Sequence, residues 1–269
     1  MSHEMHHFSL GVWVLFLAYA VSALGSLVGL LCVQQAMSAS DRRSRGVWTG
    51  FAALSIGGVA VWLMHFIGMM GFDLPGTTIR YSLMQTLLSV GLAIGPTFLG
   101  LAAVGSGAGR GRVPRLLGAG LVMGLAVSAM HYTGMWAIRI RGSIEHETGY
   151  VLASIAIGVT AATAALWFSQ VATRWYLQIP SALVMGLAVV ALHYTGMAGL
   201  TVHIDPTAPA PVGLSVNGLL FPGFGVGIVV LAVLVVKLLV TPSRRDASLE
   251  AQIAGWEAPV PAAGVAARP

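Results

Sequence analysis

The stretch MGLAVSAMHYTGMWA, residues 123–137, joins a run of small apolar residues to a histidine and a methionine one helical turn apart. Two further stretches align with it on the histidine, GGVAVWLMHFIGMMG at 57–71 and MGLAVVALHYTGMAG at 185–199. We call each of the three a cassette; their histidines are His65, His131 and His193. In every cassette glycine stands seven residues before the histidine, valine four before, glycine three after and methionine four after. Such internal repeats predict a fold built from similar helical units.

The cassettes lie in long apolar segments. Hydrophobic residues make up 57% of the 269 residues and charged residues 9%, whereas soluble domains carry about 25% charged residues. A membrane-spanning helix needs about 20 apolar residues. Seven segments qualify, namely 8–33, 47–70, 81–104, 116–138, 150–172, 181–203 and 217–240. We therefore predict an all-α membrane protein of seven transmembrane helices, arranged as three pseudo-repeated helical hairpins plus a final helix.

Basic residues predict the orientation. Eleven of the fourteen Lys and Arg residues fall in alternate breaks between the segments, in the tail, or at Lys237 close to the tail, and the exceptions are Arg80, Arg139 and Arg141. Because basic loops stay in the cytosol, the N-terminus is expected outside the membrane and the C-terminus in the cytosol. Arginines scattered over short loops predict contact with the lipid bilayer and no binding of nucleic acid. The single cysteine, Cys32, excludes a multi-cysteine metal site.

Two domains are expected. Residues 1–240 form the seven-helix membrane domain. Residues 241–269 form a short stretch rich in Ala and Pro, which predicts a disordered cytosolic tail.

Helical geometry places the repeated residues of each cassette on one face. At 100° per residue, positions −7, −4, 0, +3 and +4 relative to the histidine share a stripe. Small residues on such a stripe let helices approach closely. All three cassette helices run in the same direction, so their histidines are expected at one depth near the outer edge of the bilayer. The predicted helix-packing residues are Gly58, Gly68, Gly124, Gly134, Gly186 and Gly196.

The cassette side chains predict a metal site. Imidazole together with thioether is a ligand set that favours copper, and haem is the competing cofactor because it takes the same axial ligands. The cassettes hold no carboxylate, which argues against magnesium, calcium or a carboxylate-bridged di-iron centre. The ligands predicted on this reasoning are His65, His131, His193, Met69, Met135 and Met197. Tyr132 and Tyr194 point about 100° away on the helix, where they are expected either to anchor the helix at the membrane interface or to support the site from behind.

The remaining histidines also fall in the predicted outer half. They are His3, His6, His7, His146 and His203. Each taken alone is expected to be a solvated loop residue, with loose capture of metal from outside as the alternative.

The strings MHYTGM, LHYTGM and MHFIGM resemble the MHYT domain, a bacterial integral membrane sensor family named for Met-His-Tyr-Thr. The resemblance covers residues 8–240. It implies a metal site, proposed to hold copper, and a role in sensing oxygen, carbon monoxide or nitric oxide, and it adds Met64 and Met130 to the candidate ligands. The chain departs from the motif where Phe66 and Ile67 replace Tyr and Thr, and where Leu192 replaces Met.

Family members often carry a cytosolic output domain, whereas the tail here is short. The signal is therefore expected to leave through an unidentified partner protein or through motion of the helices. We predict a sensor or binding module, without catalytic residues, whose ligand is a diatomic gas or a metal ion. The alternatives are a membrane copper or haem oxidoreductase and a copper transport or handling protein.

Overall fold

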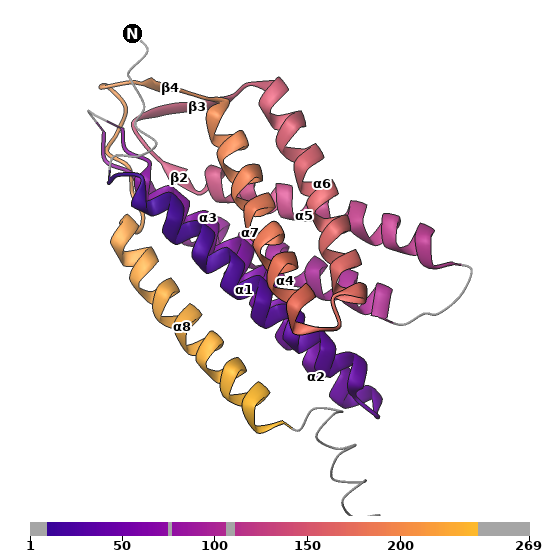
Figure 1. Ribbon diagram of the computed structural model, residues 1–269. Helices are drawn as coiled ribbons and strands as arrows, with labels where there is room; N and C mark the ends of the chain where they lie inside the picture. The colour runs from indigo at the N-terminus through magenta and orange to yellow at the C-terminus, as the bar shows by residue number, and fades with distance from the viewer. Residues whose placement is uncertain (1–9, 75–76, 106–110, 242–269) are drawn as a thin grey trace, which may run out of the picture.

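The computed structural model describes residues 10–74, 77–105 and 111–241, which form a bundle of long helices (Figure 1). Seven spans in this part of the chain are long and apolar enough to cross a membrane. They are α1 (Trp13–Ser38), a composite span over Arg42–Gly71, α4 (Leu83–Gly105), α5 (Arg112–Trp136), α6 (Thr148–Val171), α7 (Trp175–Ala198) and α8 (Val216–Val240). The seven-helix membrane fold is confirmed. The predicted tail, apart from Thr241, lies outside the described residues, as do His3, His6 and His7.

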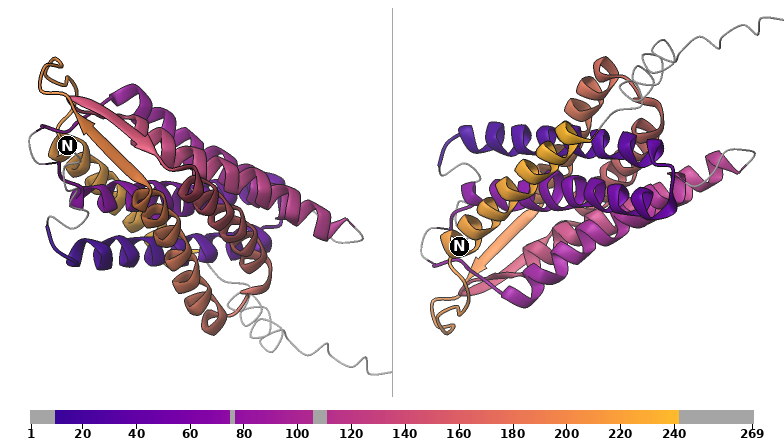
Figure 2. Two further views of the ribbon diagram at one scale, coloured as in Figure 1. Left: turned by 90° about the horizontal axis from the view of Figure 1, so that it is seen from above. Right: turned by 90° about the horizontal axis from the view of Figure 1, so that it is seen from below.

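Six spans pack around one another and the seventh lies outside them. α1 packs against both α7 and the composite span, and α4, α5, α6 and α7 follow one another side by side. α8 packs chiefly against α1 and the composite span, and it crosses their outer side in the right-hand view of Figure 2. The arrangement agrees with the predicted hairpins plus a final helix, and the structure adds that this helix is peripheral.

The composite span is not a uniform α-helix. It consists of α2 (Arg42–Ala53), the π-helix η1 (Leu54–Leu63), α3 (Met64–Gly68) and the 3₁₀ turn η2 (Met69–Gly71). The sequence prediction placed its start at residue 47, which is wrong. The side chain of Asp41 accepts a hydrogen bond from the backbone N–H of Ser44 at 2.8 Å, and this N-cap starts the helix at Arg42.

The π-helix is held against α1 by two serine hydrogen bonds. Ser22 Oγ donates to the carbonyl oxygen of Ala60 at 2.7 Å, and Ser55 Oγ donates to that of Gly25 at 2.7 Å. A Cβ on Gly25 would lie 2.8 Å from the backbone nitrogen of Ala60, so the two backbones are nearly in contact. The composite span is consequently the most buried of the seven, at 72% of its most apolar stretch.

Two short antiparallel strand pairs cover one end of the bundle, which we call the strand end. β1 (Arg80–Tyr81) pairs with β2 (Ile138–Arg139), and β3 (Gly142–His146) pairs with β4 (Leu200–Ile204). The predicted helical segments 116–138 and 181–203 are therefore wrong at their ends. In β4 the buried Leu200 and Val202 alternate with exposed neighbours, a period of two that indicates a strand and was present in the sequence LTVHI.

Candidate metal centre

Three histidines meet inside the bundle close to the strand end. His65 lies on α3, His131 on α5 and His193 on α7, and each is at most 1% exposed. They form the one cluster of three potential metal-binding side chains of the His, Cys, Asp or Glu type in the described part of the chain. His131 and His193 are 66 and 128 residues away from His65 in sequence. The fold therefore brings the histidines of all three cassettes to one point.

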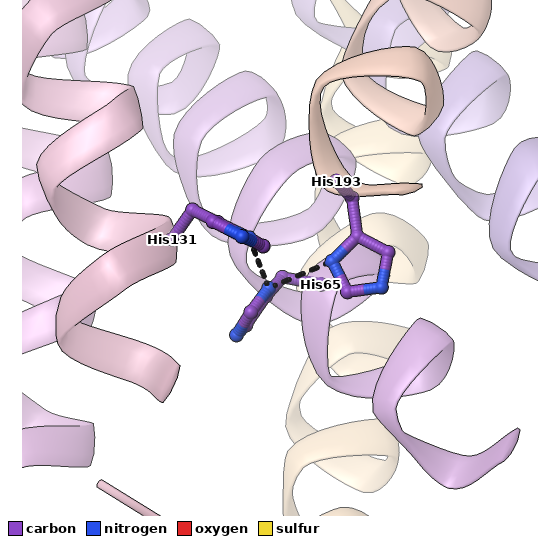
Figure 3. A group of neighbouring side chains, drawn as sticks. All are labelled: His65, His131 and His193. Carbon is purple, nitrogen blue, oxygen red and sulfur yellow. Dashed lines mark hydrogen bonds between the residues drawn. The ribbon is translucent and has the colours of Figure 1, made fainter. Parts of the chain in front are cut away.

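The three rings face one another through Nδ1 (Figure 3). The Nδ1 atoms of His65 and His193 are 3.0 Å apart, and those of His131 and His65 are 3.2 Å apart. Each pair of rings is nearly perpendicular, with interplanar angles of 82°, 82° and 85°. The cluster thus has approximate threefold symmetry, as expected for parallel repeats.

Three neutral imidazoles in this arrangement cannot all form good hydrogen bonds with one another through Nδ1. A neutral imidazole carries one proton and one lone pair on its two nitrogens, so each Nδ1 either donates one hydrogen bond or accepts one. His65 Nδ1 takes part in both short contacts, and neither tautomer serves the two fully. A cation at the centre would receive a lone pair from every ring. The donor set therefore fits a small ion with a preference for nitrogen ligands.

The other ring nitrogen, Nε2, points at a glycine of a different cassette. In each case this is the glycine three residues after that cassette's own histidine, and an added Cβ would overlap the ring. The pairs are His65 with Gly134, His131 with Gly196 and His193 with Gly68, and in each the Cβ would lie 2.4 Å from Nε2. We call this closed ring of contacts the His–Gly cycle. The glycines at +3 leave room for the imidazole of a neighbouring cassette. The helical stripe predicted from the sequence did not identify this role.

The three rings are shielded from solvent. His65 Nε2 and His131 Nε2 are buried and have no hydrogen-bond partner among the described residues. Among the described residues no carboxylate or carbonyl contacts the Nε2 atom of His65 or His131, so close packing in the His–Gly cycle is what holds these two atoms in place. A charge on any of the three rings would be costly in such surroundings unless it were shared with a bound ion.

The methionines at +4 share one hydrophobic cluster. Met69, Met135 and Met197 are each at most 2% exposed and belong to one hydrophobic cluster next to the strands, with Phe72 and Tyr81 among its members. The structure therefore brings these three predicted ligands together. Met64 and Met130 are equally buried but lie in two different hydrophobic clusters. Met64 shares one with Val14 of α1 and Ile67 of α3, and Met130 belongs to the main core of the bundle.

An aromatic ring stands beside every histidine. Tyr132 packs edge to face on His131 at 4.9 Å between centroids, and Tyr194 on His193 at 4.8 Å. The first cassette keeps the contact with Phe66, whose ring lies 4.9 Å from that of His65. What the three copies share is therefore the ring rather than the hydroxyl, and Phe66 joins the surroundings of the site although the sequence reasoning did not include it. The hydroxyl of Tyr132 hydrogen bonds with Ser154 Oγ at 2.6 Å.

The glycines at −7 divide into two kinds. A Cβ on Gly124 would lie 2.4 Å from Val159 Cα, and one on Gly186 would lie 2.9 Å from the backbone nitrogen of Ala23. Both mark close helix contacts. A Cβ on Gly58 would meet only side-chain atoms at 3.5 Å, which is ordinary van der Waals distance. Gly58 therefore does not mark a close approach of two backbones.

The two described loop histidines lie on the strands and outside the triad. His203 pairs loosely with Glu145 at 3.9 Å, and both are exposed. His146 is half-buried beside Tyr132, with ring centroids 5.4 Å apart, and burial lowers the pKa of its imidazole below the ordinary value. His146 is therefore neutral at neutral pH.

Comparison with known proteins agrees with this repeated architecture. The model of a family named MHYT, described as a bacterial signalling protein N-terminal repeat, matches residues 58–119, 124–179 and 186–253. The chain belongs to the MHYT family. Each matched repeat begins at a glycine seven residues before a triad histidine. It is thus an MHYT sensor domain of signalling proteins and a multi-pass protein of the cytoplasmic membrane.

Three relatives illustrate the context of this MHYT domain. It is 35% identical over 202 residues to the bifunctional diguanylate cyclase/cyclic di-GMP phosphodiesterase MucR of Pseudomonas aeruginosa, covering 72% of this chain and 28% of MucR. It is 29% identical to the cyclic di-GMP phosphodiesterase NbdA of the same organism and 28% identical to the signaling protein YkoW of Bacillus subtilis, in each case covering 76% of this chain and 26% of the relative. The chain thus spans about a quarter of the length of these relatives. No solved structure matches it significantly.

Proposed function

We propose that this MHYT domain holds one copper ion between the imidazoles of His65, His131 and His193, and that it senses a small diatomic gas or copper itself there. The observation that carries the proposal is the convergence of three buried Nδ1 atoms, with measured separations of 3.0 and 3.2 Å. In a site with three metal–nitrogen bonds of about 2.0 Å, neighbouring nitrogens stand about 3.3 to 3.5 Å apart. The rings need only small movements to reach that geometry.

The same spacing favours a bare ion over haem. Two axial nitrogens bound to one haem iron lie on opposite sides of the macrocycle, about 4 Å apart at bond lengths of about 2.0 Å. Here the rings face one another at shorter separations, and the third ring occupies the same space. Copper suits imidazole and thioether ligands, and each triad histidine is followed four residues later by a buried methionine, namely Met69, Met135 and Met197.

The His–Gly cycle supplies a route for the signal. An ion held by three imidazoles offers a further coordination position, which is the chemistry that binding of a small gas requires. Each ring packs closely against a glycine of another cassette helix. A ring that moved toward that glycine would therefore press on the neighbouring backbone. Binding at the triad would therefore shift α3, α5 and α7 against one another. By analogy with the relatives, we propose that the shift reaches a cyclic di-GMP output, carried by a partner protein or by further chain.

The test is metal content. The protein is purified in a mild detergent, loaded with copper and passed through a desalting column, and copper per chain is measured together with an optical spectrum. We expect about one copper per chain without a Soret band, and loss of most of the copper in His131→Gln. His203→Gln, which removes an exposed histidine, is the matched control and should bind as the wild type does. Equal copper in the two variants would disprove the site, and a Soret band would identify a haem protein.

A second measurement separates sensing from the alternatives. Titration of the loaded protein with carbon monoxide or nitric oxide should change its spectrum, and His131→Gln should abolish the change. Turnover with a quinol would instead identify an oxidoreductase, and copper uptake into sealed vesicles would identify a transporter.

A further inference from the structure

An apolar cavity of about 430 Å³ lies at the periphery of the bundle, between α8, η1 and α4. Its walls include Trp62 and Leu63 of the π-helix, Leu87 of α4, and Gly223 and Val226 of α8. The volume is in the range of small-molecule sites. All three walls are membrane spans, so the cavity lies at the depth of the lipid hydrocarbon.

The walls offer an occupant no free hydrogen-bonding group. Trp62 Nε1 donates to Ser89 Oγ at 3.0 Å, and Ser89 Oγ donates to the carbonyl oxygen of Thr86 at 2.7 Å. Thr86 Oγ1 in turn donates to the carbonyl oxygen of Ser82 at 2.8 Å. Because these polar groups are satisfied internally, the cavity selects a hydrocarbon chain.

A polar cavity of about 650 Å³ adjoins it at the strand end. Ser215 and Val216 line the polar cavity, and Leu214 and Gly218 line the apolar one, so the two meet along the start of α8. The charged side chains of the polar cavity are Arg80 and Asp73. Neither makes an ion pair with any residue that the structure describes.

We propose that the two cavities together bind one zwitterionic phospholipid of the phosphatidylethanolamine class. One acyl chain fills the apolar cavity, the phosphate meets Arg80, and the ammonium group meets Asp73. One cation and one anion in the polar cavity match the two charges of that headgroup, whereas an anionic lipid would leave Asp73 facing a net negative partner.

The position of the lipid links it to the first cassette. The acyl chain would lie against η1, which continues directly into α3 and His65. Gly58 lines this cavity, which accounts for the absence of a close backbone contact at that glycine. The binding itself does not depend on a metal at the triad, so it stands or falls separately from the proposed function.

The experiment measures lipid retained by the protein. Wild type, Gly223→Phe and Gly225→Phe are purified from membranes in mild detergent, and bound lipid per chain is measured by native mass spectrometry and extraction. A Cβ on Gly223 points toward the cavity with its nearest neighbours at 3.7 Å, whereas one on Gly225 meets nothing within 4 Å and does not line the cavity. We expect about one phosphatidylethanolamine per chain in the wild type and in Gly225→Phe, and about a tenth of that in Gly223→Phe. Equal retention in the two variants would overturn the proposal, as would recovery of a quinone or an anionic lipid instead.

The headgroup is tested in lipid nanodiscs of defined composition. Arg80→Gln should weaken phosphatidylethanolamine binding by about tenfold, the value of one charge-assisted contact. Arg139→Gln is the matched control, because Arg139 is the strand partner of Arg80 but lines a different cavity. If both arginine variants bind lipid equally, the phosphate is not held at Arg80.

Discussion

The first cassette helix and the other two carry the same motif but fold differently. Over Leu54–Leu63 the first is a π-helix inside the most buried span, whereas α5 and α7 are regular and only 33% and 39% buried over their most apolar stretches. At the histidine level the three become equivalent again through the His–Gly cycle. The symmetry of the three repeats is therefore closest at the triad, where each ring packs against a glycine of another cassette, and the helix halves farther from it pack against different neighbours.

The largest effect should come from the glycine at −7 in the second cassette. In Gly124→Ala the new Cβ would lie 2.4 Å from Val159 Cα, and backbone cannot move aside as a flexible side chain can. We expect a loss of about 3 kcal/mol in the free energy of unfolding, measured in mixed micelles. Gly58→Ala at the equivalent position would make only ordinary contacts with side-chain atoms at 3.5 Å and should change stability by less than about 1 kcal/mol. Equal losses of stability in the two variants would show that Gly124 and Gly58 do not differ in how closely a neighbouring helix approaches them.

The next effect tests the equivalent part of the cassettes. Gly134→Ala would press on the ring of His65, so we expect a loss of about 2 kcal/mol in stability together with loss of bound copper. In Gly118→Ala on the same helix the new Cβ meets nothing within 4 Å, so this variant should keep the stability and the bound copper of the wild type. Copper retention in Gly134→Ala at the wild-type level would contradict the His–Gly cycle as the device that positions the rings.

The role of the methionines at +4 is tested by a volume-conserving change. Met135→Leu should alter stability by less than about 1.5 kcal/mol but lower the affinity for Cu(I) by about tenfold, if thioether sulfur contributes to the site. Met84→Leu, at a side chain that is 76% exposed, is the control. Competition against a Cu(I) chelator measures both. Unchanged affinity in Met135→Leu would assign the methionines to packing.

The smallest effect concerns the contact that makes the first cassette helix distinct. Ser22→Ala removes the hydrogen bond to the carbonyl of Ala60 in the π-helix, and hydrogen bonds between membrane helices are worth about 0.6 kcal/mol on average. Thr160→Ala, which removes an exposed hydrogen bond within α6, should cost less. Amide hydrogen exchange over residues 54–63 should rise in Ser22→Ala alone.

Prediction from sequence succeeded where the signal is local. The apolar segments identified all seven spans, because each span must bury about 20 apolar residues in lipid whatever its neighbours are. It failed at the segment ends, where Asp41 extends one helix and the chain after Trp136 and Ala198 turns into strands. The orientation across the membrane and the nature of the metal remain predictions.

The sequence by itself determined that three histidines stand at the same height on three parallel helices, since helical periodicity and hydropathy are properties of consecutive residues. The tertiary structure alone decided that Nδ1 faces the centre and that each Nε2 faces a glycine of another cassette. It also decided that Gly124 and Gly186 pack tightly while Gly58 lines a cavity. The physical reason is that the orientation of a ring and the distance between two helices depend on side chains far apart in sequence, which pack together only in the folded protein.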